Sequence, residues 1–409
     1  MPAAFATSGS TPRYLAVGAL LCVLAACTAG PGGQPRADPA KSVPAALDHS
    51  RPTPRTTAAA RSFSIVATGD VLAHEPVVRA AQVAGSLRYD FRPLLAPIRP
   101  QLLDADLAIC HLETPLTGDR RITYYPNFSS PPQIAPALAW AGYDTCTTAS
   151  NHTLDQGVRG VRTTLDALDA VGVAHTGAAR NAPEQRPRNY TVRGVRVAHL
   201  DYTYGLNGRS VPLSAPWVVR LIDVRRILAD AHNARRAGAQ FVVLGLHWGQ
   251  EYSSAATGEQ RALARRLLAS PDIDLILGCH AHVVQPIERI GGKFVVYGMG
   301  NLLAHHAPCC NTPPTRDGLL ITAEIGLQAG RYAVRRLTYT PTYVDQRTSR
   351  VFPVAARLRD PRLSATERVT LTASWARTVA RVNALGAAAE GVTPAGPAGR
   401  PTLSPAPSG

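Results

Sequence analysis

The sequence predicts an α/β domain that contains much parallel sheet. Short apolar runs rich in β-branched residues alternate with segments whose apolar residues recur at helical spacing, as in residues 241–246 and 258–269. This alternation favours strands joined by crossover helices. Several of the apolar runs end in a carboxylate, amide or imidazole side chain. Because ligands of such sheets gather at the carboxyl ends of the strands, these side chains are the first candidates for a functional site.

The first 61 residues precede the predicted domain. Arg13 and the apolar segment 14–26 have the length of a signal-peptide core and are short for a membrane span. The segment ends in the motif Leu-Ala-Ala-Cys at Cys27, which resembles the bacterial lipobox. We therefore expect a lipoprotein signal over residues 1–27 and an extracytoplasmic chain anchored to the cell membrane by lipid. A plain secretory signal with an incidental Cys27 is the alternative.

Residues 28–61 are rich in Pro, Ala, Gly, Ser and Thr and favour a flexible, disordered tether. The domain itself is expected over residues 62–350 and begins with a strand at 62–67. Its first half then predicts helices where the apolar spacing is helical and strands where the apolar runs are continuous. In chain order these are helices from about Glu75 and at 93–103, a strand at 105–110, a helix at 133–141, a strand at 143–148 and a helix at 157–171.

The second half continues the pattern. Residues 190–202 predict a hairpin turned at Arg193-Gly194, because a glycine there accepts the positive φ of a tight turn. The elements that follow are a helix at 221–237, strands at 241–246, 273–277 and 294–297, a helix at 258–269, and two or three antiparallel strands within 319–344. A C-terminal helical extension is expected over 351–385, with one helix at 366–385, and the Ala-, Gly- and Pro-rich residues 386–409 predict a disordered tail.

The composition narrows the classes of partner. Apolar residues make up 45% of the chain, and 43 basic residues against 28 acidic ones give a formal net charge of +15. Only Lys41 and Lys293 are lysines, and no basic run carries interleaved aromatic residues. We therefore expect no nucleic-acid partner. The excess of arginine favours anionic partners such as phosphates, polyanions or lipid headgroups.

Seven cysteines are present, of which Cys22 and Cys27 fall in the predicted signal. The remaining five are an odd number for an oxidising compartment, and the sequence does not determine how they pair. Cys309 and Cys310 are adjacent, so each is expected to pair more easily elsewhere than with the other. No Cys-x-x-Cys motif indicates structural zinc, and we expect none of the five to bind metal.

The pair His280 and His282 follows the apolar run 273–277. If the extended conformation persists, both side chains point to the same face, and neutral imidazole is a common metal ligand. Other predicted strands end in comparable donors. The full set of candidates is Asp70, Glu113, Asn151, His152, His247, His280 and His282.

This set contains nitrogen and oxygen donors without thiolate, which favours manganese, iron or zinc, and a bridging carboxylate would allow two metals. Two metals about 3.5–4 Å apart activate water and stabilise both oxygens of a displacement at phosphorus. Each residue alone has a simpler explanation: Asp70 as a helix cap, Glu113 as a solvated turn residue, His247 as a packed core histidine. Their repetition at strand ends favours the metal site. For His74, a role as a helix cap or surface residue is as well supported as a role as a metal ligand.

The motifs that carry these candidates resemble, in order, those of CapA-type poly-γ-glutamate capsule proteins. They are Gly69-Asp70, Leu112-Glu113-Thr114, Ser150-Asn151-His152-Thr153-Leu154-Asp155-Gln156-Gly157, His247-Trp248-Gly249, His280-Ala281-His282-Val283-Val284-Gln285-Pro286 and Gly298-Met299-Gly300-Asn301. The resemblance covers residues 63–344. It implies a calcineurin-like, metallophosphoesterase-related two-sheet α/β sandwich flanked by helices, with a dinuclear metal site.

By this resemblance Asp70 and His282 bind one metal, and Asn151, His247 and His280 bind the other. The resemblance also gives Glu113 the bridging position and makes His152 the proton donor. Three departures from the family pattern stand out. The first motif lacks Asp-x-His, because His74 is four residues from Asp70; His111 stands where the family usually has Asn; and Cys279 replaces a glycine.

Three functions are compatible with these features. The first is a metal-dependent phosphoesterase or related hydrolase that acts on cell-surface material during capsule or exopolymer synthesis. The second is a non-hydrolytic accessory protein of the same fold that holds an anionic polymer, within a capsule synthesis or export complex. A solute-binding lipoprotein would leave the donors at the strand ends unexplained. We also predict that the loop 124–132 lines the substrate site, with a packed surface loop as the alternative.

Overall fold

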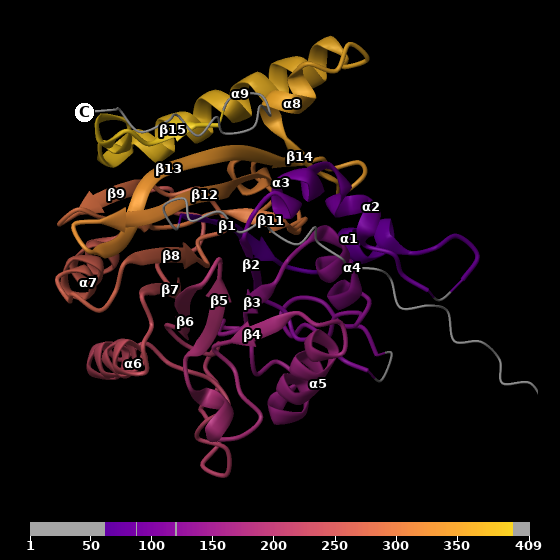
Figure 1. Cartoon of the computed structure of the whole chain (residues 1–409). Helices are drawn as coiled ribbons and strands as arrows, with labels where there is room; N and C mark the ends of the chain where they lie inside the picture. The colour runs from indigo at the N-terminus through magenta and orange to yellow at the C-terminus, as the bar shows by residue number, and fades with distance from the viewer. Residues whose placement is uncertain (1–61, 87, 119–120, 396–409) are drawn as a thin grey trace, which may run out of the picture. The chain divides into compact units, whose positions relative to one another are not determined.

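The computed structural model describes residues 62–86, 88–118 and 121–395 (Figure 1). The predicted signal and tether, residues 1–61, and residues 396–409 of the predicted tail lie outside these ranges. Within them, two β-sheets pack face to face and carry helices on their outer faces. This arrangement confirms the predicted two-sheet α/β sandwich flanked by helices.

The first sheet has the strand order β14-β13-β12-β1-β2-β3-β4, with β11 paired to β1 and β15 paired to β13. Strands β1 to β4 are parallel, so their carboxyl ends lie at one edge. Long antiparallel strands complete the other half of the sheet. The strands are β1 Phe63–Val71, β2 Leu107–Leu112, β3 Thr145–Thr147, β4 Ala174–Thr176, β11 Asn301–Leu303, β12 Asp317–Gln328, β13 Arg331–Val344, β14 Val351–Pro353 and β15 Thr393–Pro394.

The second sheet has the order β5-β6-β7-β8-β10-β9, and its four central strands are parallel. Its first two strands form the predicted hairpin, which turns at Arg193 and Gly194 with φ values of 47° and 79°. Two consecutive positive φ values are those of a tight type I′ turn. The strands are β5 Arg188–Val192, β6 Val195–Thr203, β7 Phe241–His247, β8 Leu275–Cys279, β9 Ile287–Ile290 and β10 Lys293–Val296.

The main core lies between the sheets, and alternation along the strands explains which residues enter it. In β1, Ile65 and Ala67 face the second sheet, whereas Val66 between them faces the helices. Phe63 of the first sheet and Phe241 of the second meet edge to face, with ring centroids 6.0 Å apart. The buried strand ends are therefore held by packing on both faces of each sheet.

Helices α1 to α4 cover the outer face of the first sheet, and α6 and α7 cover that of the second (Figure 1). Two of the helices begin at a capping box, Thr257 with Gln260 in α7 and Ser364 with Glu367 in α9. The α-helices are α1 Glu75–Ala81, α2 Arg92–Leu95, α3 Arg99–Leu103, α4 Ile134–Ala141, α5 Gly157–Asp169, α6 Val224–Arg236, α7 Gly258–Leu268, α8 Val354–Leu358 and α9 Ala365–Val382. Short 3₁₀ turns are η1 Ala96–Ile98, η2 Pro183–Gln185, η3 Pro313–Arg316, η4 Asn383–Leu385 and η5 Ala387–Glu390.

The C-terminal boundaries differ from those expected. Residues placed in a separate extension contribute β14 to the first sheet, and α9 is fixed to β12 through the buried carboxylate of Asp317. That carboxylate accepts hydrogen bonds from Ser374 Oγ at 2.6 Å and from Arg377 Nε at 2.6 Å. The predicted disorder from residue 386 onward is wrong for residues 386–395, because η5 is followed by β15, which pairs with β13.

The cysteines of the described domain fall into two kinds. Cys110 of β2 and Cys146 of β3 are register partners, both fully buried, and form a disulfide. Cys279 is buried and unpaired. Cys309 and Cys310 have no disulfide partner, and their sulfur atoms lie 2.6 Å apart. Each was expected to pair more easily elsewhere than with the other, and within the described residues neither forms a disulfide elsewhere.

Candidate metal centre

The donors expected at strand ends converge where the parallel strands of both sheets terminate. Asp70 lies near the end of β1 and is the register partner of His111 in β2. Glu113 is the first residue after β2. His247 is the last residue of β7, and its register partner in β8 is the residue before His280. Each of these side chains is at most 3% exposed. Sheet register and carboxyl-end placement thus account for the cluster.

The backbone of the two neighbouring histidines is not extended as expected. Strand β8 ends at Cys279, and His280 and His282 have φ values of 98° and 58°, in the left-handed region. Left-handed backbone is uncommon for residues other than glycine and is concentrated at functional sites. Both rings nevertheless belong to the cluster: His280 lies 4.6 Å from the His247 ring, between centroids, and 6.0 Å from the His282 ring.

Asp70 and Glu113 lie among the imidazoles. The Oδ2 atom of Asp70 is 3.2 Å from Nδ1 of His282, and its Oδ1 atom is 3.9 Å from Nε2 of His111. Oε1 of Glu113 lies between two histidines, 3.9 Å from Nε2 of His247 and 3.8 Å from Nε2 of His282. Nδ1 of His247 is 2.9 Å from Nε2 of His111.

Three overlapping groups of these residues have one ligand atom each within 4.8 Å of the others, close enough to share a metal ion. They are Asp70 with Glu113 and His282, Asp70 with His111 and His247, and Glu251 with His280 and His282. Within the described residues, Oδ1 of Asp70, both carboxylate oxygens of Glu113 and Nδ1 of His280 are buried without a hydrogen-bond partner. Unpaired buried oxygens of this kind are costly. The donor set and these atoms fit a divalent metal ion.

Two members of these groups were not among the predicted ligands. His111 was noted only as a departure from the family pattern, although the alternation of β2 aims it and Glu113 to the same face. Glu251 lies in the loop after β7 and approaches His280 and His282 from the side. A loop carboxylate four residues after His247 gives no signal in the sequence, because the path of that loop is set by tertiary contacts.

Burial and neighbouring charges set the protonation states within the cluster. Burial lowers the pKa of His280 to about 3 and that of His111 to about 4, so both imidazoles are neutral near pH 7. Burial alone would lower the pKa of His282 too, but the Glu113 carboxylate and the Asp70 hydrogen bond outweigh it and raise that pKa to about 9. Burial raises the pKa of Glu113. Neutral imidazole is the form that binds metal, so His282 has to release its proton when a metal binds.

Asn151 and His152 take different positions. Oδ1 of Asn151 is 2.8 Å from Nε2 of His247, which places the amide oxygen in the cluster. Nδ1 of His152 is instead 2.7 Å from Oδ2 of Asp155. Asn207 joins the two residues, because its Oδ1 accepts from Asn151 and its Nδ2 lies 3.4 Å from Nδ1 of His152. Asp155 and Asn207 therefore orient this pair.

His74 lies beside the cluster without joining any of the three ligand groups found among the described residues. Its ring is 4.6 Å from that of His306 and 5.5 Å from that of Phe128, between centroids. Burial lowers its pKa to about 3. The wider spacing from Asp70 thus places His74 among neighbouring aromatic rings.

The loop 124–132 reaches the site through one residue. Phe128 is fully buried and its ring meets His152 edge to face, with centroids 4.8 Å apart, whereas Tyr125 is 76% exposed. Two tyrosines that the sequence did not single out also flank the cluster. The Tyr204 ring lies 4.5 Å from that of His280, and the Tyr252 ring lies 6.0 Å from that of His282.

We expect Phe128→Ala to lower the free energy of unfolding by about 3–5 kcal/mol, because it removes a buried ring and leaves a cavity. Tyr125→Ala should change that free energy by no more than about 0.5 kcal/mol, since the side chain is exposed. Urea unfolding of both variants measures the difference. A Phe128→Ala protein as stable as the parent would contradict the packing role and leave Phe128 as a ligand contact only.

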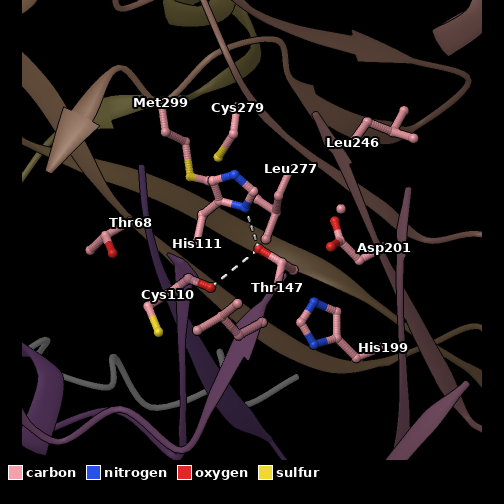
Figure 2. A pocket seen from close by; sticks show the side chains of 12 residues that line it. Thr68, Cys110, His111, Thr147, His199, Asp201, Leu246, Leu277, Cys279 and Met299 are labelled. Carbon is pink, nitrogen blue, oxygen red and sulfur yellow. Dashed lines mark hydrogen bonds between the residues drawn. The ribbon is translucent and has the colours of Figure 1, made fainter. Parts of the chain in front are cut away.

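A small cavity of about 10 Å³ lies behind the cluster, between the two sheets. Figure 2 shows its lining, in which His111 from the metal cluster is hydrogen-bonded to Thr147 at 2.7 Å. Both ring nitrogens of the lining residue His199 are buried without a hydrogen-bond partner among the described residues. Burial raises the pKa of Asp201, on the same wall, to about 8, although its carboxylate accepts from two backbone N–H groups.

The raised pKa of Asp201 predicts a pH dependence of stability. The folded chain keeps a proton that the unfolded chain releases above about pH 4, so the contribution of Asp201 to stability is fully present below that pH and is lost as the pH rises toward 8. In Asp201→Asn this loss is absent, and the stability difference between the variant and the parent should grow by about 1 kcal/mol per pH unit across the window. Urea unfolding from pH 5 to 8 tests it; a constant difference would mean that Asp201 is ionised in the fold.

The chain is similar in sequence to known proteins. The family model described as "Bacterial capsule synthesis protein PGA_cap" matches residues 64–306, more than half of the chain. The chain is 25% identical over 225 residues to a capsule biosynthesis protein CapA of Bacillus anthracis, which covers 53% of this chain and 54% of that protein. It is 27% identical over 214 residues to a probable polyglutamine synthesis accessory protein of Mycobacterium tuberculosis, which covers 48% and 55%.

The aligned part of the chain spans about half the length of these relatives. Among solved structures, it is similar to the calcineurin-like phosphoesterase YfkN of Bacillus subtilis, with 14% identity and a TM-score of 0.44 over 78% of this chain and 96% of that one.

Proposed function

The chain belongs to the bacterial capsule synthesis protein PGA_cap family, and we propose that it serves capsule or exopolymer synthesis of the poly-γ-glutamate type through metal-dependent hydrolysis of a phosphoester or related bond. The observation that carries the proposal is the buried cluster of carboxylates and imidazoles at the ends of strands from both sheets. Its unpartnered buried oxygens support a role in holding cations.

Two divalent transition metals suit this arrangement. Asp70 is shared by two of the ligand groups and His282 by two, and Oε1 of Glu113 is almost equally distant from His247 and His282. These distances support Glu113 in a bridging position. Manganese, iron and zinc match donors that lack thiolate. Bound there, two metals would supply activation of water and charge stabilisation at phosphorus.

The chain's own residues supply orientation and proton transfer. The Asp155 carboxylate accepts from Nδ1 of His152, so Nε2 of the doubly protonated ring is the nitrogen that can give a proton to a departing oxygen. Asn207 fixes the amide of Asn151 and so keeps its oxygen directed at the cluster. Burial of Asp70, Glu113 and the cluster histidines excludes bulk water, which strengthens the electrostatic interactions among them.

A non-hydrolytic accessory protein is the second candidate. The Mycobacterium tuberculosis relative is named a synthesis accessory protein, and a net charge of +15 suits the retention of an anionic polymer. Metal analysis of the purified protein, followed by a screen of phosphodiesters and phosphomonoesters, separates the two candidates. We expect metal together with hydrolysis of at least one ester. Bound metal and polymer binding with every ester intact would favour the accessory function within a synthesis or export complex.

An extracytoplasmic location is part of the proposal. The Cys110–Cys146 disulfide supports an oxidising compartment, because disulfides are rare in reducing ones. Among the described residues, no helix combines the length and apolar character that a membrane span requires. The lipid anchor proposed at Cys27 lies outside the described residues.

Cys27→Ser should therefore shift the protein from the membrane fraction to the soluble fraction or leave the signal peptide uncleaved, since the lipid-bearing thiol is gone. Cell fractionation and the mass of the mature N-terminus measure this, with Cys22→Ser as the matched control. If Cys27→Ser fractionates with membranes as the parent does and is processed normally, the anchor is wrong.

A further inference from the structure

We propose that Cys309 and Cys310 form a redox modification site, in which exchange with a low-molecular-weight disulfide closes them into a vicinal disulfide beside the candidate metal centre. The pair takes no part in the proposed hydrolysis, so the inference stands apart from the proposed function. It rests on contact between the two thiols, the exposure of Cys309, and the neighbouring position of a tyrosine that faces the metal ligands.

The local backbone brings the two sulfur atoms together. The turn that contains them is closed by hydrogen bonds from Cys310 N and Asn311 N to the carbonyl of Ala307, both at 2.9 Å. Thr315 Oγ1 adds a third bond to the Cys310 carbonyl at 3.2 Å. The sulfur atoms lie 2.6 Å apart, and Cys309 is exposed. The attacking thiol is thus accessible, and the second thiol is already in contact with it.

Covalent geometry makes such a bond labile. The Cα atoms of adjacent residues are about 3.8 Å apart or less, below the separation of about 4.4–6.8 Å across ordinary disulfides. A disulfide between them is therefore strained, and strained, exposed disulfides are the easily reduced ones. Cys110–Cys146 is the opposite case, since both of its residues are fully buried in the sheet. One domain would then hold one permanent and one reversible disulfide.

The exchange proceeds in two balanced steps. The thiolate of the exposed Cys309 attacks a sulfur of the small disulfide, forms a mixed disulfide and expels one thiolate. The thiolate of Cys310 then attacks the Cys309 sulfur and expels the second. The two protein thiols are oxidised, the small disulfide is reduced to two thiols, and the two protons pass to the departing thiolates. Excess small thiol reverses both steps.

Tyr252 connects this pair to the metal centre. Its side chain lies next to Cys310, and its backbone N–H donates to the carbonyl of Ala281, between His280 and His282, at 2.7 Å. Its ring lies 6.0 Å from that of His282, between centroids. Oxidation replaces the Cys310 thiol by a disulfide sulfur and so changes the surroundings of a residue at the edge of the centre.

The test equilibrates the purified full chain in glutathione buffers of increasing oxidised fraction, alkylates the remaining thiols and analyses tryptic peptides by mass. Residues 294–316 form one tryptic peptide with both cysteines and no other. We expect it to change from two alkylated thiols to a form lacking two hydrogens and carrying no glutathione, while Cys110–Cys146 stays closed. Two alkylated thiols in the most oxidising buffer, stable glutathione adducts on the parent, or disulfide-linked chains would each overturn the proposal.

Two variants test which thiol attacks and whether Tyr252 is connected to the pair. Cys310→Ser keeps the exposed thiol but removes the resolving one, so it should accumulate the glutathione adduct that the parent does not; absence of the adduct would mean that Cys309 is not the attacking thiol. We expect the Tyr252 hydroxyl to stabilise the reduced pair, so Tyr252→Phe should shift the midpoint glutathione ratio about fivefold toward oxidation, the equivalent of one ordinary hydrogen bond. An unchanged midpoint would overturn the link to the metal centre.

Discussion

Purified His280→Ala protein is expected to contain little or no metal and to show no hydrolytic activity. Nδ1 of His280 is buried without a partner, and its ring lies among His247, His282 and the Glu251 carboxylate. Because the pKa of His280 is lowered to about 3, the ring is a neutral donor across the whole physiological range. Loss of outer-shell partners alone costs 10–100-fold in metal affinity, so loss of a direct ligand should exceed about 100-fold.

His232→Ala is the matched control. This histidine lies on α6, its side chain is 59% exposed, and it pairs with Asp272, outside the metal cluster. It should retain the metal content and melting temperature of the parent. Metal content measured by elemental analysis on both variants, with circular dichroism to verify folding, decides the question. Full metal content in a folded His280→Ala protein would exclude His280 as a ligand and leave the set of Asp70, Glu113 and His282 as the centre.

The sequence was sufficient for the fold because its signals are local. Continuous apolar runs such as 241–246 correspond to fully buried strands between two layers, and Arg193-Gly194 encodes a tight turn by its own backbone preference. Short and terminal strands carry no strong local signal, and their positions depend on pairing with other strands. Strand β4 and strand β11 are three residues each, and the stretch with β15 is ordered by pairing with β13 and by burial of Ala387 and Val392 in the core.

The candidate site likewise contains residues that local patterns predict and residues whose positions depend on tertiary contacts. Residues at the ends of strong strands, such as Asp70 and His247, were predictable because parallel strands end at a common edge. The backbone at His280 and His282 was not, since left-handed conformations at non-glycine residues are imposed by surrounding contacts. Asn207 and Tyr252 approach from loops whose course no periodicity encodes. Sequence reasoning therefore found the donors at the ends of strong strands and missed His111, Glu251 and the loop residues that orient and flank the cluster.

His152→Ala is expected to keep the fold and metal content of the parent but to lose about 10²–10⁴-fold in the rate of phosphoester hydrolysis, the contribution of a positioned general acid. His152 Nδ1 faces Asp155, and the residue belongs to none of the ligand groups found among the described residues. Asp155→Asn should give a smaller loss, because the imidazole remains but its tautomer and orientation are no longer fixed by a carboxylate.

The choice of leaving group separates proton donation from a loss of packing against Phe128. An ester whose departing oxygen is already acidic, such as a nitrophenyl ester, needs little protonation, whereas an alkyl ester needs it fully. The loss in His152→Ala should therefore be far larger for alkyl esters than for nitrophenyl esters. Equal losses for both classes would indicate that His152 supports the structure of the site. A metal-loaded parent that hydrolyses neither class, with His152→Ala still supporting polymer production in cells, would overturn the hydrolase proposal and leave the accessory function.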